Sequence, residues 1–283
     1  MISVVLPTYN GAKYISQAIE SILNQTFKDF ELVIVNDAST DNTLNIISGY
    51  AEKDERIKVI TNAVNSKLPK SLNIGFSNCK GDYFTWTSDD NILHPDVFEK
   101  LVYVLENNSD VGFVFSCEEF IDDKGKIIGR RKHPDNLNEI YFKNIISASF
   151  LYRREVHEQL EGYDETKFLV EDYDFFLRAY EKYKFLYIPE VLYSYRKHAE
   201  SLTGTKRSEA KNRTIELLKI FNQKAVSGNV KSMTAKGISN LYLDLSNEYF
   251  LRVLDEGIKS DILYLKLHRI KDAMTRFFQN KAK

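Results

Sequence analysis

Apolar and polar positions alternate with two different periods along the first 117 residues. Five short apolar runs, rich in β-branched residues, predict buried strands at residues 2–7, 30–37, 56–60, 82–87 and 112–117. Between these runs the apolar residues recur every three or four positions, as in residues 11–25, which predicts amphipathic helices. Strands that alternate with such helices favour an α/β fold with a mostly parallel, twisted sheet and helices on both faces.

The pattern changes from about residue 118. Residues 122–126, "DDKGK", are typical of a hairpin turn, residues 171–183 have helical spacing, and residues 185–198 alternate like one or two strands. We expect this part to extend the same sheet with antiparallel or mixed strands. After Gly204 the chain has no proline and shows three helical segments: residues 215–226, 240–254 and 261–279. We therefore place a domain boundary near residue 205, between a domain of residues 1–204 and a C-terminal helical extension of residues 205–283.

The formal net charge of −1 conceals an asymmetry between these two parts. Residues 1–204 have 23 Lys and Arg against 32 Asp and Glu, whereas residues 205–283 have 16 against 8, so the extension is basic. The chain has no apolar run long enough for a membrane span, and its first residues enter a strand pattern at once, so we expect a cytoplasmic protein. Cys79 and Cys117 lack the spacing of a disulfide framework or a zinc site and are expected to be buried and inert.

Polar segments follow three of the predicted strands: "PTYN", "ND" and "SDDN". Ligands of open α/β sheets bind at the carboxyl ends of the strands, so these segments predict a binding site. Asp89 and Asp90 are adjacent there, and two neighbouring carboxylates repel each other unless a divalent cation such as Mg2+ or Mn2+ lies between them. The alternative is a simple turn with side-chain hydrogen bonds and a cap for the helix that follows Pro95.

Several motifs together resemble the family 2 glycosyltransferases with the GT-A fold. They are "SVVLPTYNGAKY", "FELVIVNDASTDNT", "GDYFTWTSDDN", "LEGYDE" and "VEDYDFFLRA", in this order. The segment at Asp89 also resembles that of the spore-coat polysaccharide nucleotide-diphospho-sugar transferase type. The resemblance covers about residues 1–200 and implies a GT-A, Rossmann-like catalytic domain; the C-terminal extension lies outside it.

The resemblance implies that Pro7, Thr8 and Tyr9 after the first strand, and Asp37 after the second, hold the base and ribose of a nucleotide. An aspartate that accepts a hydrogen bond from a ring N–H, together with a stacked tyrosine, suits uracil. The alternatives are a half-buried aromatic at a strand end for Tyr9 and a helix cap for Asp37.

The resemblance also implies a metal site. Asp90 is expected to be the more direct ligand of Mn2+ or Mg2+, Asp89 to contact the ribose or the water shell of the metal, and His198 to complete the site. Such a cation would neutralise the charge that develops on the leaving nucleoside diphosphate. Lys67 and Lys70 are expected near the pyrophosphate. His198 and the lysines could instead be ordinary surface residues.

On the acceptor side, the pair Glu171 and Asp172 resembles the family's acidic pair at the head of a helix. We expect Asp172 to be the base that takes the proton of the acceptor hydroxyl, with Glu171 beside it and Asp174 as the weaker candidate. Gly162 resembles the glycine that lets the backbone approach the donor. The alternatives are acidic residues that stabilise a helix N-terminus and a glycine that ends a helix.

The resemblance, together with the residues at the strand ends, implies an inverting, metal-dependent glycosyltransferase. The expected donor is a UDP-sugar or a related nucleotide-sugar, and the expected acceptor is a hydroxyl of a glycan, polysaccharide or lipid-linked glycoconjugate, in a setting of surface polysaccharide assembly. We expect no nucleic-acid partner. Two alternatives are a non-catalytic nucleotide-sugar binding or scaffold protein of the same fold, and a nucleotidyltransferase, which would need a Gly-rich phosphate loop where "PTYNGAKY" has one glycine.

The last 22 residues, 262–283, combine an apolar stripe with lysines and arginines. A basic amphipathic helix can bind an anionic membrane surface, which would place the enzyme at the cytoplasmic face of a membrane. The alternative is that the apolar stripe packs on the catalytic domain or on another subunit of a homo-oligomer.

Overall fold

The computed structural model describes residues 1–255 and divides the chain into two compact units. Unit 1 comprises residues 1–134 and 146–204, and unit 2 comprises residues 135–145 and the chain from residue 205 onward. A short segment from the middle of the sequence therefore belongs to the helical C-terminal unit. A division of catalytic roles at residue 205 stays a prediction.

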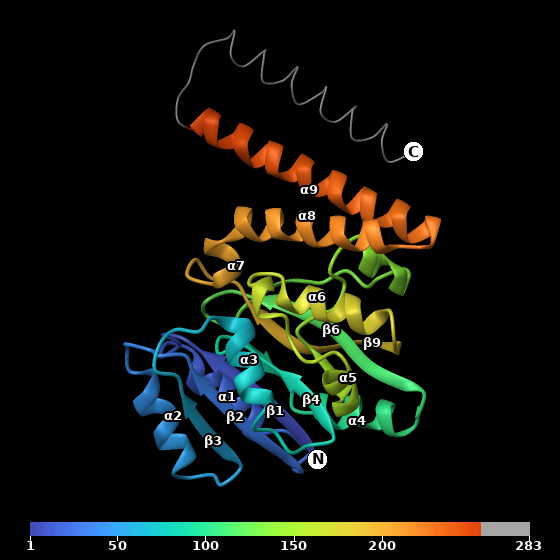
Figure 1. Cartoon of the computed structure of the whole chain (residues 1–283). Helices are drawn as coiled ribbons and strands as arrows, with labels where there is room; N and C mark the ends of the chain where they lie inside the picture. The colour runs from blue at the N-terminus through green and yellow to red at the C-terminus, as the bar shows by residue number, and fades with distance from the viewer. Residues whose placement is uncertain (256–283) are drawn as a thin grey trace. The chain divides into compact units, whose positions relative to one another are not determined.

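Unit 1 is built on one mixed sheet (Figure 1). Its strands are β1 (Ile2–Thr8), β2 (Phe30–Asn36), β3 (Ile57–Thr61), β4 (Tyr83–Trp86), β5 (Ile92–Leu93), β6 (Val111–Ile121), β7 (Ile127–Arg130), β8 (Phe150–Arg153) and β9 (Lys184–Arg196). The order β3-β2-β1-β4 is parallel, and β8 joins this part to β6 through antiparallel pairs. β9 runs parallel to β6, and β5 and β7 are antiparallel additions. The predicted α/β fold with a mixed extension of its sheet is confirmed.

One face of the sheet is covered by α1 (Ile15–Leu23), α2 (Thr43–Ala51) and α4 (Val97–Glu106). The alternate residues Ile2, Val4 and Leu6 of β1 point to this face, where they are fully buried with Ile19 of α1 and Leu105 of α4. Side chains alternate between the two faces of a strand, and burying each large aliphatic side chain contributes about 1.5–3 kcal/mol. The period-2 pattern of β1 thus fixes which helices it contacts.

The other face is covered by α3 (Leu68–Phe76), α5 (Arg154–Gln159) and α6 (Glu171–Tyr180) (Figure 1). α3 lies close to the sheet at Gly75, where a Cβ atom would come within 2.4 Å of Val5. Aromatic rings fill the space under α5 and α6. Phe113 stacks on Phe185 with ring centroids 4.3 Å apart, and Tyr152 contacts Phe175 at 5.2 Å.

The structure defines where α2 and β9 begin and end. α2 begins at Thr43, and Asp41 accepts a hydrogen bond from Thr43 N at 3.0 Å. Of the one or two strands predicted at residues 185–198 the structure has one, β9 (Lys184–Arg196). The prediction of two buried cysteines is confirmed, and burial raises the pKa of the Cys79 thiol to about 12, which keeps it protonated.

Unit 2 contains the short 3-10 helix η1 (Leu137–Tyr141) and the helices α8 (Arg207–Lys224) and α9 (Gly228–Asp255), with α7 (Leu202–Thr205) at its junction with unit 1. α8 and α9 are antiparallel. Lys211 Nζ contacts Glu248 Oε1 at 2.7 Å at one end of the pair, and Asn222 Nδ2 contacts Thr234 Oγ1 at 2.6 Å at the other.

The predicted helix at residues 261–279, and with it the predicted membrane or subunit contact of residues 262–283, lies outside the described residues. Within residues 1–255, none of the helices combines the length and the apolar character that crossing a bilayer requires.

Candidate active site

The carboxyl ends of β1, β2 and β4 meet at one edge of the sheet. Asp37 N donates a hydrogen bond to Thr8 O at 2.8 Å, and the Thr8 hydroxyl donates to the carboxylate of Asp89. The structure therefore brings Thr8, Asp37 and Asp89 together. Pro7 is buried within β1, whereas Tyr9 projects from the strand end with 51% of its surface exposed.

The Asp37 carboxylate is almost fully buried and holds the loop between β3 and α3. It accepts hydrogen bonds from Asn62 Nδ2 at 2.8 Å, Ser66 N at 2.7 Å and Lys67 N at 2.9 Å. Lys67 has a φ of 66°, an uncommon conformation that these bonds stabilise. Asp37 is therefore no cap of the helix that follows it. A carboxylate has about four acceptor positions, so room for one further donor remains.

The loops that follow β1 and β2 are tied to each other. Asn10 N donates to Ser39 Oγ at 2.9 Å, Thr40 N donates to Asn10 Oδ1 at 2.8 Å, and Ala12 N donates to Asp41 Oδ2 at 3.2 Å. Two segments that the sequence presents separately thus form one rim beside Tyr9.

Gly11 is a site residue that the sequence analysis missed. A Cβ atom at this position would lie 2.1 Å from Asp89 Oδ2 and 2.6 Å from Thr8 Oγ1. The glycine therefore makes room for the bond between Thr8 and Asp89. Its signal in the sequence is the single glycine of "PTYNGAKY", directly after the predicted strand.

Replacing Gly11 by Ala is expected to displace the Asp89 carboxylate and to weaken nucleotide binding at least tenfold, about 1.4 kcal/mol. Titration calorimetry with UDP and Mn2+ measures this loss. Gly49→Ala is the matched control, because a Cβ atom on Gly49 in α2 has no neighbour within 4 Å. Equal affinities for Gly11→Ala and the wild type would show that the close approach has no role in binding.

The two adjacent aspartates have different surroundings. Burial raises the pKa of Asp89 to about 7, and the charge of Asp90 adds to this effect while the bond from Thr8 opposes it. Asp90 Oδ2 lies 3.0 Å from His198 Nε2, at the end of β9. The structure thus brings Asp90 and His198 together, although 107 residues separate them in the chain. A cation placed here would favour the ionised form of Asp89.

The donor atoms at this place fit a hard divalent cation that is shared with a ligand. Asp90 Oδ1 and His198 Nδ1 are buried and find no hydrogen-bond partner within residues 1–255. No group of three or more His, Cys, Asp and Glu side chains forms a ready-made metal site in that same range. Mg2+ and similar ions are commonly held by one or two carboxylates together with water and substrate phosphates. Asp90 supplies such a carboxylate, and the His198 imidazole adds a nitrogen ligand of the kind that transition-metal ions accept.

Arg196, which the sequence analysis also missed, connects the Asp89–Asp90 doublet to two other segments of the chain. It is 1% exposed and donates from Nε to Asp90 O at 2.8 Å, from Nη2 to Gln17 Oε1 at 2.7 Å, and from Nη1 to the carbonyl oxygens of Asp122 and Asp123. Its guanidinium lies over the Tyr14 ring at 4.5 Å, and that ring is 5.1 Å from the His198 ring. Arg196 therefore positions the backbone of one candidate ligand and packs beside the other.

The predicted base lies at the first turn of α6. Asp172 is half-buried and its Oδ1 accepts from Tyr173 N at 2.7 Å. Glu171 is almost fully buried, and both this burial and the charge of Asp172 raise the pKa of its carboxyl. Burial raises the pKa of Tyr163 as well, and Asp172 and Glu171 raise it further, which places both acids near this hydroxyl.

Three buried polar atoms near these acids lack a hydrogen bond of good geometry in the described part of the chain, although Trp86 and Tyr152 lie near the Tyr163 hydroxyl. They are Trp86 Nε1, Tyr163 Oη and Glu171 Oε2. Buried polar groups are nearly always paired, so an unpaired set suggests a polar ligand or ordered water. Trp86 packs edge-on against Phe150, with ring centroids 6.2 Å apart, and its side chain lies close enough to Tyr163 to oppose the rise of the Tyr163 pKa.

Asp174 has a structural role. Its carboxylate pairs with Arg178 Nε at 2.8 Å, and the same guanidinium donates to Leu160 O and Gly162 O. Gly162 has a φ of +72°, and its N–H donates to His157 O at 3.0 Å. This geometry is typical of a glycine that follows the end of a helix, here α5, which is the alternative that the sequence analysis gives for Gly162. Its approach to a donor stays a prediction.

Lys67 and Lys70 are exposed on α3 and the loop before it. The Lys67 ammonium lies 5.2 Å from the centre of the Phe168 ring, so this side chain connects the α3 loop to the loop before α6. A contact of either lysine with phosphate stays a prediction.

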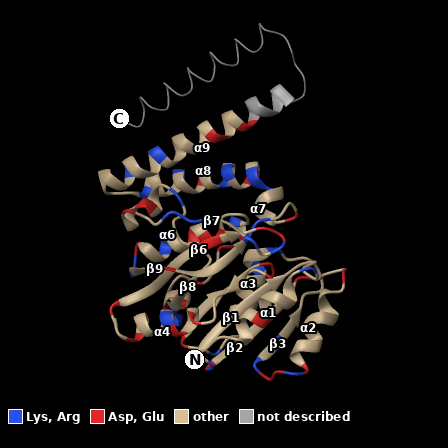
Figure 2. Ribbon diagram, turned by 180° about the vertical axis from the view of Figure 1, so that it is seen from behind, with Lys and Arg blue, Asp and Glu red and all other residues tan. Residues whose placement is uncertain are grey.

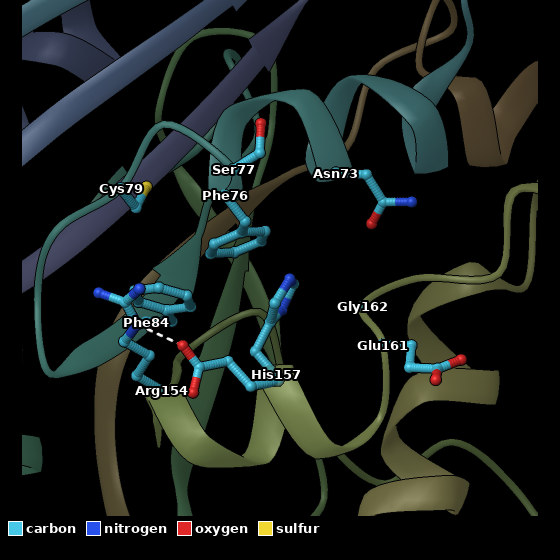
Figure 3. A pocket seen from close by; sticks show the side chains of 10 residues that line it. Asn73, Phe76, Ser77, Cys79, Phe84, Arg154, His157, Glu161 and Gly162 are labelled. Carbon is cyan, nitrogen blue, oxygen red and sulfur yellow. Dashed lines mark hydrogen bonds and ion pairs between the residues drawn. The ribbon is translucent and has the colours of Figure 1, made fainter.

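A pocket of about 410 Å³ lies between α3 and α5 (Figure 3). His157 points into it beside Phe76, and Arg154 pairs with Glu158 at 2.7 Å. Gly162 is at its border and is the one predicted site residue that lines it. The pocket does not include the carboxylates at the strand ends, so we treat it as separate from the candidate active site.

Comparison with known proteins decides the family. The model of glycosyl transferase family 2 matches residues 3–181 of the chain. The chain belongs to the family 2 glycosyltransferases. This glycosyltransferase is 30% identical over 275 residues to an uncharacterized glycosyltransferase of Haemophilus influenzae, covering 90% of this chain and 85% of the relative. The predictions of family and enzyme class are thereby confirmed, and the nucleotidyltransferase and non-catalytic alternatives are not supported; the likeness to the spore-coat type stays a prediction.

Solved structures confirm the GT-A fold of this glycosyltransferase. S. aureus TarS 1–349 in complex with UDP-GlcNAc superposes with a TM-score of 0.71 at 20% identity, covering 89% of this chain and 76% of TarS. The mannosyltransferase PcManGT of Pyrobaculum calidifontis in complex with GDP-Man and Mn2+ gives a TM-score of 0.68 at 16% identity, covering 99% and 82%.

Proposed function

We propose that this glycosyltransferase moves a sugar from a nucleoside diphosphate donor, with inversion at the anomeric carbon and with Mn2+ or Mg2+, to a hydroxyl of a glycan or lipid-linked glycoconjugate. The observation that carries the proposal is the meeting of Thr8, Asp37, Asp89, Asp90 and His198 at the carboxyl edge of the sheet. The unpaired atoms of Asp90 and His198 at that edge support a cation site.

The donor would bind with its base between Tyr9 and Asp37. Tyr9 is exposed at the strand end and offers a ring face for stacking, and Asp37 retains room for one ring N–H. A neutral pyrimidine with one acidic ring N–H, uracil, suits this pair. TarS binds UDP-GlcNAc and PcManGT binds GDP-Man, so a nucleotide-sugar is the class of donor that these folds accommodate.

Asp90 and His198 would hold the cation, and Asp89 would contact the ribose or the water around the metal. When bound, the cation would supply positive charge to the β-phosphate as the diphosphate leaves. Asp172 would accept the proton of the acceptor hydroxyl while the acceptor oxygen bonds to the anomeric carbon and the bond to the diphosphate breaks. Trp86 Nε1, Tyr163 Oη and Glu171 Oε2 are available for sugar hydroxyls.

The proposal is tested by thermal unfolding with UDP, GDP, CDP and ADP, each with and without Mn2+. We expect UDP to raise the melting temperature only with Mn2+, because the cation is needed to bind the diphosphate. The size of the shift follows from binding to the folded state, which stabilises a protein by about 2.7 kcal/mol at one hundred times the Kd. Asp90→Ala should abolish the shift. Asp110→Ala, which removes one exposed carboxylate paired with Lys184, is the matched control. Metal-independent stabilisation that persists in Asp90→Ala would contradict the assignment of the doublet.

A further inference from the structure

The hairpin of β6 and β7 carries a concentrated basic surface. Residues 124–132, "KGKIIGRRK", contain five basic residues and no acidic one. Lys124, Lys126 and Arg130 are exposed, whereas Arg131 is held by Glu118 at 2.6 Å. The preceding Asp122 is engaged in the turn, where its carboxylate accepts from the backbone N–H groups of residues 124 and 126. Asp123 in the turn is exposed, and Glu119 Oε2 lies 3.8 Å from Arg130 Nε, but the basic residues outnumber these acids, so the hairpin has a net positive charge. Lysines and arginines are blue, and aspartates and glutamates red, in Figure 2.

Two adjacent isoleucines lie within this basic surface. Ile127 and Ile128 are 52% and 53% exposed. The pairing register shifts between them, because Ile127 lies opposite Ile121 and Gly129 opposite Phe120; Ile128 is therefore an extra, bulged residue that interrupts the alternation of faces. β7 pairs with β6 at the margin of the sheet, so neither of its faces meets the main core. Lysines on an edge strand discourage pairing between sheets, but they do not account for two large apolar side chains exposed side by side.

We infer that this hairpin surface, defined as Lys124, Lys126, Ile127, Ile128 and Arg130, docks on the anionic surface of a lipid bilayer. Basic side chains gain from anionic head groups, and neighbouring apolar side chains enter the boundary of the acyl chains. The combination of three exposed cations and two exposed isoleucines on one hairpin matches both requirements.

The charge distribution argues against other occupants. A second copy of this surface would bring its basic residues against one another. Single-stranded nucleic acid is bound mainly by aromatic stacking along a basic groove, and residues 124–132 contain no aromatic side chain. An anionic surface that also accepts aliphatic side chains is the partner that remains.

The docking surface is connected to the active site. Arg196 Nη1 donates to Asp122 O at 3.1 Å and Asp123 O at 3.2 Å in the hairpin turn, and its Nε donates to Asp90 O. Docking would therefore hold the strand-end site close to the bilayer, where a lipid-linked acceptor is presented. This consequence rests on the proposed function, whereas the docking itself does not.

Flotation of the full chain with vesicles tests the inference. One set of vesicles is phosphatidylcholine, and the other is an equal mixture of phosphatidylcholine and phosphatidylglycerol. We expect binding to the anionic vesicles only, weakening as salt is raised. The triple variant Lys124→Gln, Lys126→Gln, Arg130→Gln should bind about a hundredfold more weakly, because each basic residue near an anionic surface contributes about fivefold.

The matched control neutralises Lys28, Lys53 and Lys80, three exposed lysines elsewhere in unit 1, and should float like the wild type. The double variant Ile127→Ser, Ile128→Ser should lose the binding that remains at high salt. Equal flotation of the hairpin triple variant and its control would overturn the inference. It would also be overturned if the same residues bound a mixed-sequence RNA oligonucleotide while the protein did not bind vesicles. The stabilisation by UDP and Mn2+, measured on the same proteins, should be unchanged, so failure of docking and failure of the proposed function are distinguished.

Discussion

Asp172→Asn is expected to reduce sugar transfer by about 10²–10⁴-fold while donor binding is kept, because general base catalysis contributes a factor of this size. Asparagine preserves the shape of the side chain and the bond from Tyr173 N, so the fold of α6 should be retained. Initial rates of UDP release in the presence of acceptor measure the loss, and the melting shift with UDP and Mn2+ verifies that the donor still binds.

Glu171→Gln is the matched control for this experiment. Burial and the charge of Asp172 raise the pKa of Glu171, which favours its neutral form, and glutamine is close to that form in shape and charge. We therefore expect Glu171→Gln to change the rate far less than Asp172→Asn. The reverse order, with Glu171→Gln the slower enzyme, would transfer the role of the base to Glu171.

The residues at the strand ends could be predicted because they depend on local patterns. The apolar runs locate β1, β2 and β4, and the carboxyl ends of parallel strands must meet at one edge of the sheet. The prediction that Thr8, Asp37 and Asp89 lie together therefore needs no knowledge of a long-range contact. Their roles in binding stay predictions that the variants above test.

The missed residues depend on contacts between distant segments. Arg196 is one basic residue in "YRKH", and nothing local shows that its donors reach segments near residues 17, 90 and 122. Gly11 matters because the Thr8 and Asp89 side chains approach it, and Asp89 is 78 positions away. Strand β5 has only two residues, too few to show any period.

The division into two units also depends on contacts that the sequence does not show. Residues 135–145 belong to unit 2, but they follow directly on the β6–β7 hairpin and precede β8, both in unit 1. Composition changes near residue 205, and a boundary can be placed there from charge and helical spacing. A short insertion that joins a later unit changes neither charge nor period, so only three-dimensional contacts reveal it.

Arg196→Lys should lower both stability and metal-dependent donor binding. The five N–H groups of a guanidinium spread in a plane, and Arg196 uses this geometry to bond oxygens of four residues at once; an ammonium places its donors on one atom. At least one buried carbonyl would lose its partner, which costs about 1–3 kcal/mol. If the carbonyl of Asp90 is among those released, the Asp90 carboxylate is no longer fixed beside His198. We then expect the Mn2+ concentration needed for stabilisation by UDP to rise about tenfold, which corresponds to about 1.4 kcal/mol.

Stability alone would not establish that Arg196 positions the metal ligands. Arg153→Lys is therefore the matched control, since Arg153 also donates to three carbonyl oxygens, those of residues 105, 108 and 111, away from the doublet. Its melting temperature should fall by a similar amount, but its Mn2+ dependence should match the wild type. If Arg196→Lys and Arg153→Lys lose stability equally and keep the same Mn2+ dependence, Arg196 only supports the fold. If the Mn2+ dependence shifts in Arg196→Lys alone, the Arg196 guanidinium holds the candidate metal ligand Asp90 in a fixed position relative to β9 and the β6–β7 turn.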